Sequence, residues 1–124
     1  MQKYKAIISD FDGTLAGRDG VISTKLVEAI HTWMNAGNHF SIATGRQFIH
    51  IKDQCKVLGL TTPQIVRGAS EIVDPITEKI IWHEYISKED IKPLIHILTP
   101  NQIPFSVEKV YKQHSHVILS DALR

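Results

Sequence analysis

A short apolar segment that ends in two aspartates constrains this chain more than any other feature. Residues 5–15 read KAIISDFDGTL, in which an apolar run leads into Asp10 and Asp12 and a Gly-Thr pair then breaks the pattern. A short β-branched run that stops at a turn is typical of a buried strand in a parallel sheet. Open α/β sheets bind ligands at the carboxyl ends of their strands. We therefore predict that Asp10 and Asp12 lie at a functional site.

The two aspartates also have a simpler interpretation, because Asp-Gly is a common turn dipeptide. Two carboxylates this close repel each other, and a divalent cation or a shared proton relieves the repulsion. A D-x-D-G-T-L sequence behind an apolar strand is far more specific than an isolated Asp-Gly. The pattern therefore favours metal-assisted or nucleophilic chemistry at Asp10 and Asp12.

A helix and a second strand follow the first strand. Ser23 is a typical N-cap, apolar residues recur at helical spacing over 24–36, and Gly37 is a typical C-cap glycine. Residues 40–43 then form a short apolar run. A strand, a crossover helix and a parallel strand make a right-handed unit, so the two strand ends should lie side by side.

The second strand ends at Thr44-Gly45-Arg46, which this geometry brings close to Asp10. A threonine hydroxyl can donate to a phosphate oxygen, and Gly45 lets the backbone approach closely. We expect Arg46 to open the next helix, whose N-terminal N–H groups favour an anion. Alone, Thr44 would be an N-cap, but with Asp10 and Asp12 upstream a phosphate site is favoured. Arg46 could equally pair with a surface carboxylate.

These motifs resemble those of the haloacid dehalogenase-like (HAD) phosphohydrolase superfamily. DFDGTL resembles its first motif, and IATGR at 42–46 and GLTTPQIVRGAS at 59–70 follow in the order of the Cof-type, subfamily IIB branch. The resemblance implies an α/β fold. Residues 1–82 would form the N-terminal part of a three-layer, Rossmann-like core with a parallel sheet. Residues 83–124 would begin an α+β cap or supply the last elements of a truncated fold.

The resemblance also implies a role for each motif residue. Asp10 would be the nucleophile that forms an aspartyl-phosphate, and Asp12 the acid and base for the leaving group and for water. Both would bind Mg²⁺, Asp12 through its backbone carbonyl, and the substrate would be a small phosphorylated metabolite such as a sugar phosphate. The phosphate would be held by backbone N–H groups and a hydroxyl around the two strand ends, at Phe11, Gly13, Thr44 and Gly45.

Arginines stand at two positions where substrate would lie, Arg46 and Arg67. Cof-type relatives usually have Asn-Gly-Ala where this chain has Arg67-Gly68-Ala69. The extra cation would favour a more anionic substrate or mark a site that is no longer used. Arg18 and Asp19 fall where the family carries a small flap, and they are either substrate contacts or solvated loop charges.

The remaining elements are predicted from periodicity and turn residues. Phe48, Ile51, Cys55 and Leu58 share one face of a second helix. A third strand at 64–67, a hairpin at 71–74 and 79–82, a helix from 87 that Pro93 distorts or delays, and strands at 103–110 and 116–119 follow. His114 and His116 lack a third ligand, so we expect exposed histidines rather than a metal site.

Composition excludes several classes of protein. The 124 residues suffice for one domain with a core, and a net charge of +1 without a basic stripe argues against nucleic-acid binding. No apolar run approaches membrane-spanning length, and the first residues do not resemble a signal peptide, so we expect a cytoplasmic protein that does not bind membranes. Cys55 is the single cysteine and is expected to be a packed thiol.

Two parts of a complete HAD site are not evident: a lysine or arginine beside the nucleophile, and an acidic pair on a later strand. Lys109, Lys112 and Asp121 are poor substitutes, because no helix-length crossover separates the lysines from the last strand. We expect a fragment or truncated member whose exposed sheet edge invites self-association. The alternatives are an inactive binding module and, less favoured, a receiver-type domain. Receiver domains carry their acceptor aspartate at the end of the third strand, where this chain has no carboxylate before Glu71.

Overall fold

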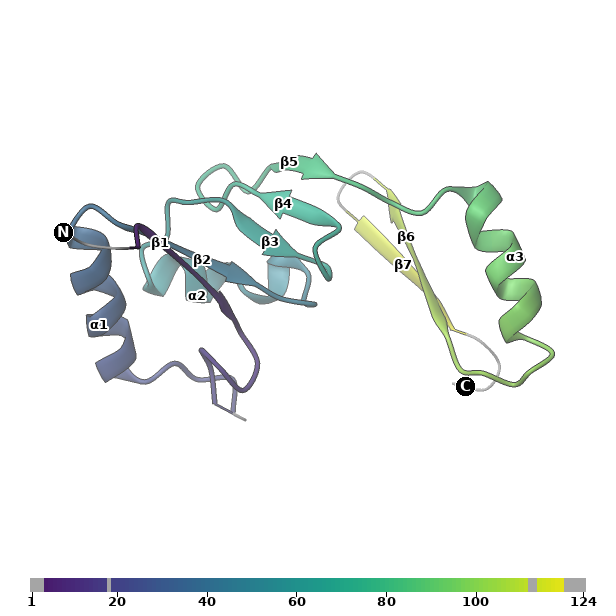
Figure 1. Ribbon diagram of the computed structural model, residues 1–124, viewed down its shortest axis with the longest axis horizontal. Coiled ribbons are helices and arrows are strands. Elements are labelled where there is room, and N and C mark those ends of the chain that lie inside the picture. Colours follow the sequence, from purple (N-terminus) through teal and green to yellow (C-terminus); the bar gives the residue numbers. More distant parts are fainter. Residues whose placement is uncertain (1–3, 18, 112–113, 120–124) are drawn as a thin grey trace. The chain divides into compact units, whose positions relative to one another are not determined.

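The computed structural model describes residues 4–17, 19–111 and 114–119, and the chain divides into two compact units, 1–84 and 85–124 (Figure 1). The first unit contains β1 (Ala6–Asp10), α1 (Thr24–Asn35), β2 (His39–Ala43), a 3₁₀ turn η1 (Phe48–His50), α2 (Lys52–Val57), β3 (Gln64–Val66), β4 (Glu71–Val73) and β5 (Ile80–His83). The second contains α3 (Lys88–Leu98), β6 (Ser106–Tyr111) and β7 (His114–Leu119). None of the helices described is both long enough and apolar enough to span a membrane.

The first unit is built on a five-stranded sheet in the order β1-β2-β3-β4-β5. β1, β2 and β3 run parallel, with Asp10 beside Ala43 and Ala43 beside Ile65. β3, β4 and β5 are joined as antiparallel neighbours. The α/β class, the parallel core and the hairpin after the third strand are therefore as predicted, and the carboxyl ends of three strands meet at one edge of the sheet.

One face of this sheet forms the hydrophobic core. The cluster combines alternate residues of the strands with residues of both helices: Phe40, Ile42, Val66, Val73, Ile30 of α1, and Ile51, Cys55 and Leu58 at α2. Because both helices contribute to one cluster, they cover the same face. Ser41, Ala43, Ile65 and Ile72, on the opposite face, remain half-buried. The described part of this unit thus forms two of the three layers that the family resemblance implies, and Cys55 is a packed thiol as predicted.

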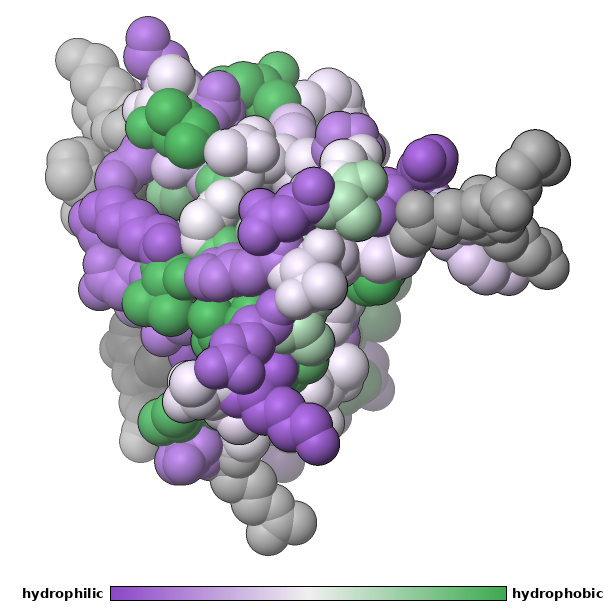
Figure 2. All heavy atoms as spheres, turned by 90° about the vertical axis from the view of Figure 1, so that its left-hand side faces the viewer, coloured by the Kyte–Doolittle hydropathy of each residue, from purple (hydrophilic) through white to green (hydrophobic). Residues whose placement is uncertain are grey.

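The first strand is less buried than its sequence suggests. β1 lies at an edge of the sheet, pairs with β2, and leaves Ile7 40% and Ile8 61% exposed. A strand is buried on both faces only if neighbours cover it, and the described residues supply a neighbour on one side alone. The prediction of a buried strand is therefore wrong for this chain. On the face shown in Figure 2, green hydrophobic patches lie between purple hydrophilic side chains.

The two helices of the first unit differ in how well their ends were predicted. The Ser23 hydroxyl oxygen accepts from the backbone N–H of Leu26 at the start of α1, and Gly37 adopts a φ of +79° after it, as expected. The predicted second helix is instead the turn η1 followed by the short helix α2, with a break at Ile51 (φ −123°). Ile51 is fully buried, as the apolar pattern predicts, although the helix is interrupted at this residue. As a result, no helix begins at Arg46.

Polar side chains join β2 to β3. Gln64 is fully buried; its Oε1 accepts from the backbone N–H of Ile42 at 2.7 Å, and its Nε2 donates to the carbonyl oxygen of Thr62. The Thr62 hydroxyl in turn donates to the carbonyl oxygen of Phe40. These side chains continue the hydrogen bonding between the strands on the amino-terminal side of the Ala43–Ile65 pair.

The second unit consists of one helix and one hairpin. Ser87 caps α3 by accepting from the N–H of Asp90, and the helix continues through Pro93 from its first turn, so the predicted delay does not occur. β6 and β7 pair antiparallel, with Ser106 opposite Leu119. The side chains of His114 and His116, like Lys112 and Asp121, lie outside the described residues, so the expectations about them stay predictions.

Candidate active site

The loop after β1 is held by its apolar residues and presents its polar ones to solvent. Phe11, Leu15 and Ala16 are buried, and the N–H groups of Leu15 and Ala16 donate to the carbonyl oxygen of Phe11 at 3.1 and 2.8 Å. Gly13 has a φ of +72°, which a residue with a Cβ adopts only at a cost. Because the core fixes both ends of this turn, Asp12 is exposed at a defined place beside the end of β1.

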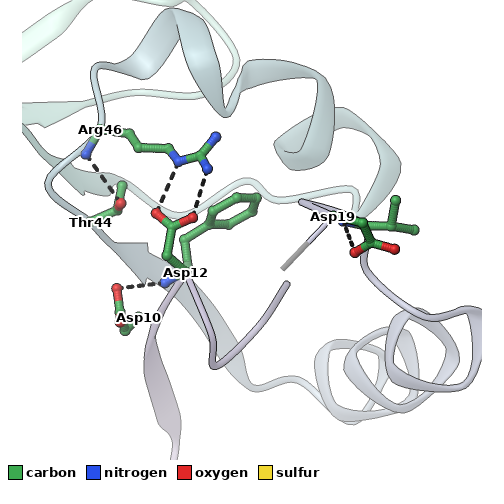
Figure 3. Close-up of polar contacts among 7 residues, drawn as sticks. Asp10, Asp12, Asp19, Thr44 and Arg46 are labelled. Atoms are coloured by element: carbon green, nitrogen blue, oxygen red, sulfur yellow. Dashed lines mark hydrogen bonds and ion pairs between the residues drawn. The ribbon is translucent and has the colours of Figure 1, made fainter. Parts of the chain in front are cut away.

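The two aspartates point to different partners (Figure 3). One Asp10 carboxylate oxygen accepts from the N–H of Phe11 at 2.7 Å. Both Asp12 oxygens accept from Arg46, Oδ2 from Nε at 2.9 Å and Oδ1 from Nη2 at 2.6 Å. These hydrogen bonds, and secondarily the guanidinium charge, lower the pKa of Asp12 below its usual value and raise that of Arg46. Asp12 is therefore an ionised carboxylate at neutral pH in this conformation.

Thr44 lies where the sequence predicted it, directly after the β2 residue that pairs with Asp10. It is buried, its N–H donates to the carbonyl oxygen of Ile65, and its hydroxyl oxygen accepts from the N–H of Arg46 at 3.2 Å. Because the oxygen acts as an acceptor here, the hydroxyl hydrogen can be donated to an anion. A Cβ at Gly45 would meet no atom within 4 Å, so the space in front of this turn is open.

Arg46 takes the alternative that its sequence left open, an ion pair with an exposed carboxylate. Asp12 could not be identified from the sequence as this carboxylate, because the two residues are 34 positions apart. Their proximity follows from the parallel pairing of β1 and β2, which sets the two following loops side by side. A fork–fork pair of this kind fixes both direction and distance, unlike a single contact.

Arg67 is turned away from solvent. Its Nε lies 2.8 Å from Oε1 of Glu71, and the two side chains are 9% and 4% exposed. The backbone here is left-handed over three residues, with φ of 52° at Arg67, 62° at Gly68 and 70° at Ala69. Since Glu71 offsets the charge of Arg67 within the protein, this conformation gives no support to Arg67 as a cation for the substrate.

Two of the predicted phosphate donors are already used inside the loop. The N–H of Phe11 donates to Asp10, and the N–H of Gly13 donates to the carbonyl oxygen of Ala16 at 3.0 Å. In this conformation neither points at an anion, because the loop closes on itself. Asp19 accepts from the N–H of Val21 in a local turn, and Arg18 lies outside the described residues.

The described residues fit part of a magnesium site. Carboxylate and carbonyl oxygens are the ligands that Mg²⁺ prefers, and it commonly uses one or two protein carboxylates together with water and phosphate. The exposed Asp10 carboxylate and the backbone carbonyl of Asp12 meet this requirement. Within the ranges that the structure covers, no group of three or more His, Cys, Asp or Glu side chains is placed to hold a metal. The donor set is thus suitable in chemistry and incomplete in number.

Comparison with solved structures places the fold. A haloacid dehalogenase-like hydrolase from Bacteroides thetaiotaomicron superposes with a TM-score of 0.68 at 19% identity, over 98% of this chain and 46% of its own. A second B. thetaiotaomicron protein, described among phosphatases of the HAD superfamily, gives 0.74 at 20%, over 92% and 41%. A HAD subclass IIB sugar phosphatase gives 0.66 at 21%, over 91% and 43%. At these identities the likeness shows the fold alone.

Sequence comparison extends the agreement. A protein of Buchnera aphidicola subsp. Baizongia pistaciae (strain Bp) with phosphatase in its name is 29% identical over 92 residues, which are 74% of this chain and 34% of that protein. The chain therefore spans about a third of this relative and less than half of the solved structures named above. The family model for haloacid dehalogenase-like hydrolases matches residues 7–121, from β1 into the tail beyond β7. The chain belongs to the haloacid dehalogenase-like hydrolase family.

Proposed function

We propose that this chain carries the nucleophile half of a Mg²⁺-dependent phosphatase site for small phosphorylated metabolites, such as sugar phosphates. One observation carries the proposal: Asp10 at the end of β1 pairs with Ala43 at the end of β2, so Thr44, the next residue, lies near Asp10. Asp12 lies in the loop that follows β1. Two carboxylates and a hydroxyl at the carboxyl ends of neighbouring strands support the roles of nucleophile, acid-base group and phosphate donor for Asp10, Asp12 and Thr44. The names of the relatives, which include phosphatases and a sugar phosphatase, support the same reaction class.

The reaction would proceed in two displacements. A carboxylate oxygen of Asp10 attacks phosphorus, the bond from phosphorus to the leaving oxygen breaks, and that oxygen takes a proton from Asp12. Asp12 must gain this proton before the step, and it then gives up one of the two hydrogen bonds that it accepts from Arg46 in this conformation. Water then attacks the phosphorus of the aspartyl-phosphate, its proton passes to the Asp12 carboxylate, and the Asp10 carboxylate is released with phosphate. Thr44 donates its hydroxyl hydrogen to a phosphoryl oxygen. Bound Mg²⁺ supplies positive charge that offsets the negative charge of the transition state.

Substitution of the nucleophile tests this proposal. Asp10→Asn keeps the size of the side chain and removes the nucleophilic carboxylate, so phosphate release from p-nitrophenyl phosphate in Mg²⁺ should disappear. Asp53→Asn is the matched control, because Asp53 is an exposed aspartate on α2 that has no assigned role in the site. The covalent intermediate should appear as protein-bound phosphate that hydroxylamine removes. Equal turnover by wild type and Asp10→Asn would refute the assignment.

A second candidate function is phosphate binding without turnover. It is favoured by the short list of metal ligands among the described residues. Titration with Mg²⁺ and beryllofluoride separates the two functions. Binding of beryllofluoride without phosphate release would support the binding module, and release of phosphate would support the phosphatase.

A further inference from the structure

We propose that Arg46 is a positioning residue that orients Asp12 for proton transfer and keeps its carboxylate out of the metal coordination sphere. This inference rests on the proposed function, since it concerns the metal and the acid-base group of the same site. Its evidence is nevertheless independent, because it comes from the contacts of Arg46.

Arg46 connects the loops that follow three parallel strands. Its guanidinium binds Asp12 after β1, and its N–H donates to the hydroxyl oxygen of Thr44 after β2. Its carbonyl oxygen accepts from the N–H of Arg67 after β3, at 2.9 Å. The guanidinium carbon also lies 5.0 Å from the centre of the ring of Phe11, which is fully buried. The residue is therefore fixed at its backbone and at its charged end.

This geometry uses both oxygens of the Asp12 carboxylate. Each oxygen accepts one hydrogen bond from the guanidinium, so the carboxylate cannot rotate about its bond to Cβ without losing these two bonds. A cation that approached these oxygens would also approach the positive guanidinium. The ligands left to a metal are the Asp10 carboxylate and the Asp12 carbonyl. The carboxylate that moves a proton is thus kept apart from the group that holds the cation.

The shape of arginine is essential to this role. Lysine carries the same charge but offers a single ammonium point, which cannot hold two oxygens in one plane. Arg46→Lys should therefore loosen Asp12 while leaving the local charge intact. Arg46→Gln removes the charge and the fork together. Comparison of the two variants separates charge from geometry.

Metal binding without substrate gives the decisive measurement. The affinity for Mn²⁺ is measured on the full chain by electron paramagnetic resonance, for wild type, Arg46→Gln, Arg46→Lys, Asp12→Asn and the double variant Arg46→Gln/Asp12→Asn. Arg46→Gln should bind Mn²⁺ about tenfold more tightly, since the released carboxylate becomes a ligand and an added charged ligand raises the affinity for a divalent cation. Arg46→Lys should lie between wild type and Arg46→Gln. Lys52→Gln, the same loss of charge on α2, is the matched control and should change nothing.

The double variant identifies the source of the gain. If the freed Asp12 carboxylate reaches the metal, Asp12→Asn removes the gain in the Arg46→Gln background and has little effect when Arg46 is present. A gain that persists in the double variant would overturn the inference, because the Asp12 carboxylate would not be its source. No gain in Arg46→Lys would overturn it too, because this variant keeps the charge and the gain in Arg46→Gln would then come from charge alone. No gain in Arg46→Gln, including a failure of every variant to bind Mn²⁺, would overturn it as well.

The same variants separate this inference from the proposed function. The Mn²⁺ measurements need no turnover, so a chain without phosphatase activity still decides the role of Arg46. Where p-nitrophenyl phosphate is hydrolysed, Arg46→Gln should lower kcat with little change in KM, because the group that it misplaces acts on the proton and not on substrate binding. A rise in KM at constant kcat would instead make Arg46 a substrate-binding residue and refute the positioning role.

Discussion

Replacement of Gln64 by leucine tests whether a buried polar side chain stabilises the pairing of β2 with β3 near the candidate active site. Gln64 is fully buried and makes two hydrogen bonds, one from the N–H of Ile42 and one to the carbonyl oxygen of Thr62. Leucine fills similar space but offers neither a donor nor an acceptor. The Ile42 N–H would then lie in the core without its acceptor, next to the strand end that carries Thr44.

The expected loss can be worked from these two bonds. A buried backbone N–H left without a partner costs roughly 1–3 kcal/mol, and the lost bond to Thr62 about 1 kcal/mol more. The apolar leucine offsets part of this by its own burial. We therefore expect Gln64→Leu to lower the free energy of unfolding by about 1–3 kcal/mol, which is a substantial share of the roughly 5–15 kcal/mol typical of a folded domain.

Urea unfolding followed by tryptophan fluorescence measures this loss in the relevant unit. Trp33 and Trp82 are the two tryptophans of the chain, and both lie in the first unit. Gln54→Leu on α2 is the control, because Gln54 is half-exposed, and its effect should stay within about 0.5 kcal/mol. A loss below about 1 kcal/mol for Gln64→Leu would refute the assignment of these hydrogen bonds as a join between β2 and β3.

Four further predictions concern single positions. Ala69→Gly should stabilise the first unit by roughly 0.5–1 kcal/mol in the same assay, because Ala69 is held at a φ of 70°, whereas Ala29→Gly in α1 should destabilise it by about 1 kcal/mol. Gly45→Ala should leave the free energy of unfolding unchanged, since the added methyl meets open space. If a ligand approaches this turn, the variant should weaken inhibition of p-nitrophenyl phosphate hydrolysis by inorganic phosphate, and unchanged inhibition would contradict that approach. Burial raises the pKa of the Cys55 thiol to about 11, so a disulfide reagent should react with it in urea and not in the folded chain, and rapid labelling of the folded chain would contradict its packing. Two backbone N–H groups of the following turn donate to Asp74 and lower its pKa below 3.8 in the folded chain. The stability that ionised Asp74 contributes is therefore complete above its unfolded pKa and is lost as the pH falls through its folded pKa. Asp74→Asn should flatten this acid limb of the free energy of unfolding plotted against pH, and an unchanged limb would exclude Asp74 as its source.

The sequence allowed prediction of those features that depend on near neighbours in the chain. Ser23 and Gly37 mark the ends of α1 through their own side-chain and backbone preferences, and the handedness of the crossover places Thr44 beside Asp10. The exposure of Ile8 was not predictable in this way, because an apolar strand has the same sequence whether or not a further neighbour covers it.

Side-chain pairs between loops were also beyond the sequence. The bond from Arg46 to Asp12 depends on the direction in which the loop after β1 turns. The hydrogen bonds within residues 11–16 set that direction, and they are visible only in the structure. The same holds for Arg67, whose left-handed backbone turns its side chain to Glu71. Periodicity reports which face a residue shares with others, and it contains no information about partners across irregular turns.

The edge position of β1 has a consequence for the motions of the site. Asp10 is the last residue of β1, which pairs with β2 alone among the described elements. The backbone amides of β1 should therefore exchange their hydrogens with solvent faster than those of β2. A polypeptide that paired with the outer edge of β1 would suppress this opening, and a ligand that required an ordered Asp10 would then bind more tightly. By thermodynamic reciprocity the ligand would strengthen the pairing by the same factor. The outer edge of β1 and the proposed phosphate site would thus be linked through the order of the five residues of β1.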